Sequence, residues 1–208
     1  MILFLDTETN GFPSDGKAAN DPTQAQICQL GAILYSEKRR VVAELNVLIS
    51  RTGWEIKPML TEIHGIDNAL CDQYGVSLAT AMSLLAHMWA RADLLVCHNV
   101  PFDTRMIALA AEVTNLRGYL KELPNFCTMK ATTDICQLPK ARGAGYKWPK
   151  LTEAYMHFFG ETLDCAHDAM ADVRGCARIY YALQDGRQST GSRSSVSVED
   201  IPSSGGPI

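Results

Sequence analysis

The order of aliphatic segments along the chain is the feature that most limits its fold. Three runs rich in aliphatic residues come first, at residues 2–6, 25–36 and 39–50, and a short polar stretch between the second and third is typical of a hairpin. From residue 77 onward, segments with helical apolar spacing alternate with shorter extended segments. A chain that begins with a hairpin and continues with alternating strands and helices is expected to form an α/β domain with a mixed sheet.

Local signals place the later elements. Ser77 is a preferred N-cap for a helix over residues 77–91, and Pro101 suits the first turn of a helix over residues 101–113. The remaining expected elements are a short helix within residues 54–67, a strand at 92–99, a strand running into a helix at 125–136, and helices at 148–160 and 166–183.

Length and composition fit one globular domain. The chain has 208 residues, of which 47% are hydrophobic and 20% charged, enough for a substantial core. The net charge of −4 argues against non-specific coating of nucleic acid, but it allows a local basic surface or an acidic pocket. From Gly186 onward Ser and Gly dominate, so we expect a domain over residues 1–185 and a flexible tail over 186–208.

Targeting signals are not evident. No stretch approaches the roughly 18 consecutive apolar residues of a membrane span, and the first apolar run stops at Asp6, too early for a signal peptide. The 7 cysteines are widely spread without a Cys-x-x-Cys pair, which favours neither a zinc site nor a disulfide framework. We therefore expect a cytoplasmic protein without membrane contact.

Acidic residues follow several of the expected strands. Asp6 and Glu8 point to the same side of the first strand, because successive side chains alternate faces. Asp103 opens a helix directly after a buried strand, and Asp172 lies in the last expected helix, shortly after His167. In open α/β sheets, strand ends and helix starts gather in one crevice, so we expect these five side chains to converge. The alternative is a solvated strand end that runs into a polar turn.

Such a cluster suits metal-assisted hydrolysis. Four carboxylates repel one another unless cations lie between them, and Mg²⁺ or Mn²⁺ prefers oxygen ligands. A neighbouring histidine can take a proton from water. Two metal ions about 3.5–4 Å apart clamp the attacking and leaving oxygens in phosphodiester hydrolysis. The residues alone thus favour a two-metal nuclease.

Three motifs carry a family resemblance. "DTETNG", "HNVPFD" and "HDAMAD" resemble, in order and spacing, the motifs of the DEDDh (DnaQ-like) 3′–5′ exonucleases, which include the proofreading epsilon subunit of DNA polymerase III and ribonuclease T. "LTEIHGID" and "KWPKLTEAYMHFFG" resemble further family segments, so the resemblance covers roughly residues 1–184. It implies a ribonuclease H-like fold, a five-stranded mixed sheet flanked by helices, with the second strand antiparallel.

The resemblance also implies roles for the acids. Asp6, Glu8 and Asp172 would hold the metal on the nucleophile side. Asp6 would bridge to a second Mg²⁺ or Mn²⁺ ion, which Asp103 would support, and His167 would be the general base. The implied enzyme is a 3′–5′ exonuclease that hydrolyses single-stranded or frayed DNA ends and releases nucleoside 5′-monophosphates. RNA is the alternative substrate, and a non-catalytic nucleic-acid-binding module is the alternative from another class.

Substrate contacts are expected beside the motifs. The candidates are Thr7, Thr9, His64, Asn99, Phe102, Lys147 and Trp148. Residues 140–150 hold four cations and two aromatic residues without an acid, which suits a phosphate backbone and its bases, although a solvated loop is an equal alternative. Asp168 is expected to cap a helix. The loop at residues 12–25 is longer than the family pattern suggests. A polymerase or replication complex is an open partner, but the tail offers no amphipathic helix to dock one.

Overall fold

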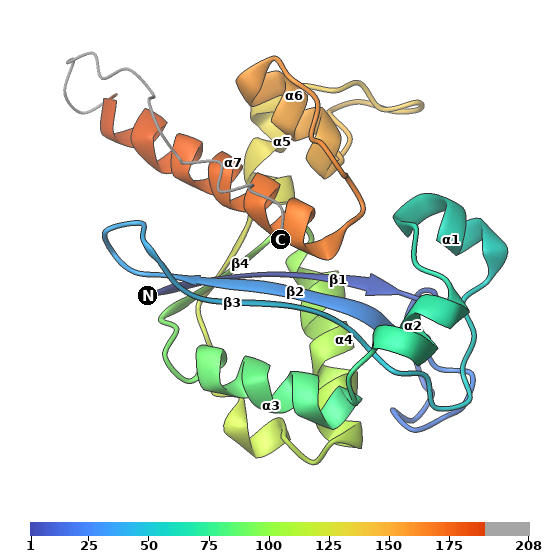
Figure 1. Cartoon of the computed structure of the whole chain (residues 1–208). Helices are drawn as coiled ribbons and strands as arrows, with labels where there is room; N and C mark the ends of the chain where they lie inside the picture. Colours follow the sequence, from blue (N-terminus) through green and yellow to red (C-terminus); the bar gives the residue numbers. More distant parts are fainter. Residues whose placement is uncertain (190–208) are drawn as a thin grey trace.

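The computed structural model describes residues 1–189 of the chain, and its centre is one five-stranded sheet in the order β3-β2-β1-β4-β5 (Figure 1). The strands are β1 (Ile2–Thr9), β2 (Ile27–Tyr35), β3 (Val41–Leu48), β4 (Leu94–Cys97) and β5 (Asn125–Cys127). β2 is antiparallel to both of its neighbours, whereas β4 and β5 continue the sheet parallel to β1. The expected mixed sheet with an antiparallel second strand is confirmed.

Helices cover both faces of the sheet (Figure 1). α3 (Leu78–Trp89) and α4 (Val100–Val113) pack on one face, and α5 (Thr128–Cys136), α6 (Leu151–Phe159) and α7 (Ala169–Ser189) pack on the other. Two starts follow the expected local rules: Ser77 accepts a hydrogen bond from the Thr80 backbone, and α4 has a proline in its first turn.

β1 contributes to both halves of the core. Leu3 and Leu5 pack in the cluster beneath α3 and α4, whereas Phe4 packs against α6 and α7. This alternation continues to the end of the strand, because the side chains of a strand point to opposite faces in turn. Asp6 and Glu8 therefore lie on the α7 face, and Thr7 lies on the α4 face.

Two short helices lie beyond the ends of β2 and β3. α1 (Pro58–His64) falls within the helix expected over residues 54–67, but α2 (Asn68–Tyr74) was not expected. Asp67 caps α2 by accepting a hydrogen bond from Leu70 N at 2.8 Å. The 3₁₀ turn η1 (Arg117–Tyr119) was not expected either. Both segments are too short to show apolar periodicity, so nothing but their caps could have predicted them.

A glycine in β2 allows α7 to approach the sheet closely. A Cβ atom on Gly31 would lie 2.7 Å from the carbonyl carbon of Ala169 and 2.8 Å from its oxygen. Any side chain there would push away the first turn of α7. Because Gly31 also pairs with Asp6 across the sheet, this close approach brings the start of α7 beside the acidic end of β1.

The end of α7 corrects one expected boundary. The helix continues to Ser189, so residues 186–189, which the sequence assigned to a flexible tail, are helical. The rest of the expected tail, residues 190–208, lies outside the described residues. Among the described helices, none has the length and apolar character needed to cross a membrane.

Candidate active site

Asp103 lies in the first turn of α4 and is hydrogen-bonded to a side chain of β1. Its carboxylate is 2% exposed, and its Oδ1 accepts a hydrogen bond from Thr7 Oγ1 at 3.0 Å. Asn99, an expected substrate contact, is the N-cap residue of this helix, although its side chain makes no capping bond. The Thr7 hydroxyl thus holds the third acid beside the first two, and its expected contact with substrate stays a prediction.

The start of α7 brings two further side chains to β1. Glu8, His167 and Asp172 each offer one ligand atom, and these atoms lie within 4.8 Å of one another. Asp172 Oδ1 also accepts a hydrogen bond from the His167 backbone N–H at 3.3 Å. His167 has a left-handed backbone with φ of +70° and an exposed side chain. The structure thus places a histidine close to two carboxylates that could hold a metal ion.

A buried glutamine fixes this helix start on the sheet. Gln29 is 5% exposed, its Nε2 donates to Asp168 Oδ2 at 2.8 Å, and its Oε1 accepts from Ala169 N at 3.1 Å. Asp168 Oδ1 in turn accepts from the backbone of Met170 and Ala171, at 3.1 and 3.0 Å. The expected capping role of Asp168 is confirmed. Sequence analysis missed Gln29, whose only signal is a polar residue within an apolar strand.

Burial and mutual repulsion together raise the pKa values of the clustered acids. Burial, then the neighbouring Asp103 and Asp172, raises the pKa of Asp6 well above its usual range. The same causes, burial first, raise the pKa of Glu8 to about 8, and burial raises the pKa values of Asp103 and Asp172 to about 7 and about 6. Within residues 1–189, none of these four carboxylates has a Lys or Arg partner. An all-oxygen set without a protein counter-charge fits Mg²⁺ or Mn²⁺.

His64 lies beside the Thr9 backbone at the end of β1. His64 is buried, its Nδ1 accepts from Ile66 N at 3.1 Å, and its Nε2 has no hydrogen-bond partner among the described residues. Burial lowers the pKa of His64, the Thr9 backbone beside it opposes this shift, and nearby His167 adds to it. Because Nδ1 accepts, Nε2 carries the proton, and this buried N–H lies beside the Thr9 backbone. The Thr9 hydroxyl is engaged, since it donates to Gly11 O at 2.8 Å.

Two aromatic rings border the site. Phe102, the residue before the buried acid of α4, packs edge-to-face on Phe12 with ring centroids 5.9 Å apart. Phe12 is 83% exposed, which is unusual for a phenylalanine that already has a partner. Sequence analysis missed this residue. Its signal was an aromatic side chain directly after the Asn10–Gly11 turn of the first motif.

Lys147 and Trp148, two expected substrate contacts in the segment before α6, differ in their surroundings. Lys147 forms an ion pair with Glu153, so its ammonium group is engaged by the chain itself. Trp148, by contrast, is 64% exposed. His98 is a buried structural residue: its ring nitrogens lie 2.9 Å from Thr128 Oγ1 and 3.0 Å from Pro149 O.

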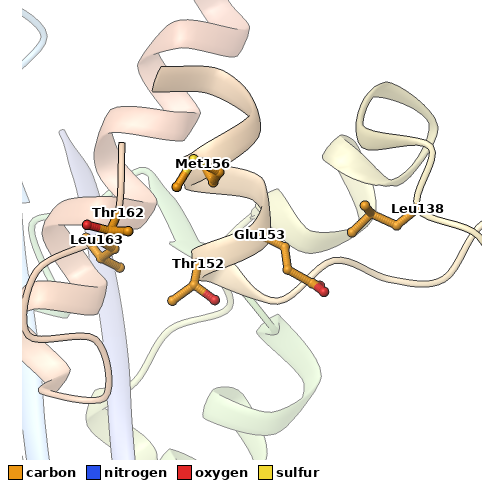
Figure 2. Close-up of a pocket in the computed structure, with 6 residues that line it drawn as sticks. All are labelled: Leu138, Thr152, Glu153, Met156, Thr162 and Leu163. Atoms are coloured by element: carbon orange, nitrogen blue, oxygen red, sulfur yellow. The ribbon is translucent and has the colours of Figure 1, made fainter. Parts of the chain in front are cut away.

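An apolar groove lies beside α6, separate from the acids. Figure 2 shows its lining, and its volume is about 500 Å³. The lining residues are Leu138, Thr152, Glu153, Met156, Thr162 and Leu163. None of the four clustered acids borders this groove, so the hollow and the candidate chemistry are different places on the molecule.

Comparison with known families agrees with the fold and the motifs. The sequence model of the family RNase_T, described as Exonuclease, matches residues 3–180. The chain therefore belongs to this exonuclease family, which confirms the resemblance to the DnaQ-like exonucleases.

Individual relatives are similar over part of their length. A DNA polymerase III subunit epsilon-like protein from Rhodobacter capsulatus is 32% identical over 110 residues, which are 51% of this chain and 14% of that protein. Escherichia coli exonuclease I, crystallised with a dT13 oligonucleotide, is similar in structure with a TM-score of 0.70 and 18% identity, over 91% of this chain and 42% of that one. The zinc-bound form of the E. coli exonuclease I–single-stranded DNA complex has a TM-score of 0.69 and 15% identity, over 90% and 41%. The chain thus spans less than half of these proteins, and the structural likeness confirms the ribonuclease H-like exonuclease fold.

Proposed function

We propose that this chain is a metal-dependent 3′–5′ exonuclease that hydrolyses single-stranded or frayed DNA ends and releases nucleoside 5′-monophosphates. The observation that carries the proposal is the grouping of Glu8, His167 and Asp172 within 4.8 Å, beside two further acids that lack a protein counter-charge. Membership of the exonuclease family supports it.

The four carboxylates would hold two Mg²⁺ or Mn²⁺ ions. Asp6, Glu8 and Asp172 come from β1 and α7, and Asp103 comes from α4, so the sheet and two helices together would fix the ligand set. When bound, such ions polarise the scissile phosphodiester and lower the cost of charge on the leaving oxygen.

His167 is the proposed general base. Its side chain is exposed to solvent while its backbone N–H is bonded to Asp172, so the ring can reach a water molecule from a fixed position. A base must lie within hydrogen-bond reach of the proton it removes, and the side chains around it set that position. Gln29 contributes indirectly, because it holds the helix start that follows His167.

Residues around the cluster would bind the 3′-terminal nucleotide. The exposed ring of Phe12, packed on Phe102, offers apolar surface to a base, and His64 stays a proposed contact of this nucleotide. The depth of Asp103 favours a single strand, because a duplex end would have to unpair before its phosphate reached the acids. The similar E. coli protein is bound to single-stranded DNA, which supports DNA as the substrate.

RNA stays the alternative polymer, because no described side chain is dedicated to a 2′-hydroxyl. The epsilon-like relative supports a polymerase or replication complex as a partner in the cell. The cytoplasmic location expected from the sequence stays a prediction.

A time course on 5′-labelled DNA and RNA of one sequence tests the proposal. With Mg²⁺ or Mn²⁺ we expect products that shorten from the 3′ end, no reaction in EDTA, and faster loss of DNA. Faster loss of RNA would reassign the substrate. Intact strands with both metals, together with retarded bands in a gel, would replace the enzyme by a binding module.

A further inference from the structure

The segment between α5 and α6 forms a projecting hairpin that the proposed chemistry does not use. Pro139 and Tyr146 form an antiparallel bridge, and Lys147 N donates to Leu138 O at 2.9 Å. Gly143 and Gly145 close the turn with φ of +82° and +86°, a backbone region that suits glycine. We name residues 138–150 the basic arm. In Figure 1 it extends beyond α6, on the side of the molecule where β1 ends.

Most of the positive charge of the basic arm lies on side chains without an ion-pair partner. Lys140, Arg142 and Lys150 are exposed, and none of them has an ion-pair partner within the described residues. No acid lies between Asp134 and Glu153 in the sequence, and Glu153 is already paired with Lys147. A protein with a net charge of −4 thus concentrates three unpaired cations on one narrow projection.

Aromatic surface accompanies this charge. Trp148 is 64% exposed and Tyr146 is 37% exposed, so both rings have open faces or edges near the base of the arm. An indole this exposed gains little from packing within its own chain, whereas it can stack on a nucleic-acid base. The pairing of cations with aromatic rings is the combination that binds single strands without regard to sequence.

A buried histidine connects the arm to the acidic end of the sheet. His98 follows the last residue of β4 directly, and its Nε2 lies 3.0 Å from Pro149 O, next to Trp148. The carbonyl can only accept, so Nε2 donates and Nδ1 accepts from Thr128. The same strand end leads into the helix turn that carries Asp103. The base of the arm is therefore fixed relative to the proposed reaction centre.

We propose that the basic arm binds the nucleic-acid strand upstream of the nucleotide being removed, with Lys140, Arg142 and Lys150 on phosphates and Trp148 on a base. The direction of the bound strand, with its 3′ end at the acids, rests on the proposed exonuclease function. The binding of a single strand by the arm does not depend on that function. Lys147 is already paired with Glu153, so the proposal assigns the phosphate contacts to the other three cations. Apolar walls and the Glu153 carboxylate make the neighbouring groove a poor path for phosphates (Figure 2).

The test compares arm variants with a charge-matched control on long and short substrates. We would measure the affinity for a labelled 20-nucleotide single strand in EDTA, and kcat and KM for that strand and for a dinucleotide with Mn²⁺. The arm variants are Lys140→Gln with Arg142→Gln, and Trp148→Ala. The control is Lys38→Gln with Arg40→Gln, which removes two exposed cations at the hairpin between β2 and β3, the opposite end of β1 from the acids.

Trp148→Ala should weaken 20-mer binding about 5- to 150-fold, the range for loss of one base–aromatic stack. The double arm variant should reduce the slope of log affinity against log salt by about 1.4, since each phosphate contact on a single strand contributes about 0.7. KM for the 20-mer should rise, while kcat and the dinucleotide reaction stay unchanged, and the control should match wild type.

The two proposals fail in different ways. If arm variants bind the 20-mer as tightly as wild type with an unchanged salt slope, the arm has no part in strand binding. An equal loss in the control would also overturn it, because the effect would then come from total charge. If arm variants lose 20-mer binding but wild type hydrolyses nothing, the arm assignment stands and the exonuclease proposal fails.

Discussion

Gln29 Nε2 donates a 2.8 Å hydrogen bond to Asp168 Oδ2 and thereby joins the middle strand of the antiparallel half of the sheet to the residue after His167. The same buried side chain accepts from Ala169 N, the first residue of α7. An amide is suited to this position because it donates to one group and accepts from the other. One side chain thus sets where α7 begins, and with it the positions of His167 and Asp172.

We expect Gln29→Leu to lower kcat by up to about 10²-fold, the cost of a displacement of about 1 Å in a catalytic group. The apolar replacement leaves the Asp168 carboxylate and the Ala169 N–H without their partner, so the start of α7 should shift. KM for DNA should change little. Steady-state kinetics and a melting curve measure both effects.

Asn46→Ala is the matched control, because Asn46 Oδ1 also accepts from Gln29 Nε2, at 3.0 Å, but contacts no residue of α7 through that bond. It should keep near wild-type kcat. Equal kcat values for both variants would show that Gln29 does not position the helix start.

Sequence reasoning was most successful where one local rule decides the outcome. Ser77 and Asp168 as caps depend on hydrogen bonds within a few residues, the proline of α4 depends on its own fixed φ, and all three features are present. The convergence of the acids was also predictable, because strand ends and helix starts of an α/β sheet meet at one edge. This prediction requires only the order of strands and helices, not the positions of individual side chains.

It was least successful where a polar side chain serves a distant partner. Gln29 and Asp168 are 139 residues apart, and Thr7 and Asp103 are 96 apart, so neither pair has a local signal. The ion pair of Lys147 with Glu153, six residues along the chain, was also missed, because composition does not show which of several nearby lysines pairs with an acid.

His167→Ala should lower kcat by about 10²–10⁴-fold, the usual contribution of a general base. Because the ring is exposed, the melting temperature should change little, and the carboxylates should still bind Mn²⁺, measurable by titration calorimetry. His157→Ala is the control, since that histidine is exposed on α6 outside the acidic cluster. Turnover equal to wild type in the first variant would remove His167 from the mechanism.

Asp172→Asn separates an enzyme from a binding module. The substitution keeps the size of the side chain and removes a charge from the group that also holds Glu8 and His167. We expect hydrolysis to fall to background while the affinity for a single-stranded oligonucleotide in EDTA is kept. A variant that still hydrolyses DNA at the wild-type rate would contradict the proposed ligand set.

The acids predict a pH-dependent stability of the metal-free protein. Burial, then repulsion, raises the folded-state pKa of Glu8 to about 8, and burial raises that of Asp103 to about 7, whereas free carboxyls ionise near pH 4. Between about pH 4 and 8 the folded chain thus holds more protons than the unfolded one, so stability falls as pH rises. In EDTA the melting temperature should drop over this interval, by about 2–4 °C for each kcal/mol lost.

Bound Mn²⁺ and the neutral substitution Glu8→Gln should both oppose the loss of stability at high pH. Mn²⁺ should raise the melting temperature more at pH 8 than at pH 5, because ionised carboxylates bind it. In EDTA at pH 8, Glu8→Gln should melt higher than wild type. Glu37→Gln, at the exposed hairpin after β2, is the control and should leave the profile unchanged. A profile in EDTA that is flat from pH 5 to 8 would mean that the acids do not repel as the structure indicates.

Phe12→Ala should raise KM for single-stranded DNA without lowering stability. Phe12 is 83% exposed and touches the ring of Phe102, so its removal exposes little core but takes away half of the apolar border of the site. A lost base contact of about 1–3 kcal/mol corresponds to a rise of about 5- to 150-fold in KM. Tyr119→Ala, which removes a ring that is 67% exposed in η1, is the control for loss of an exposed aromatic residue. If both variants keep the wild-type KM, the rings do not hold the terminal base; if kcat falls instead, Phe12 acts on the reaction through Phe102 and the neighbouring Asp103.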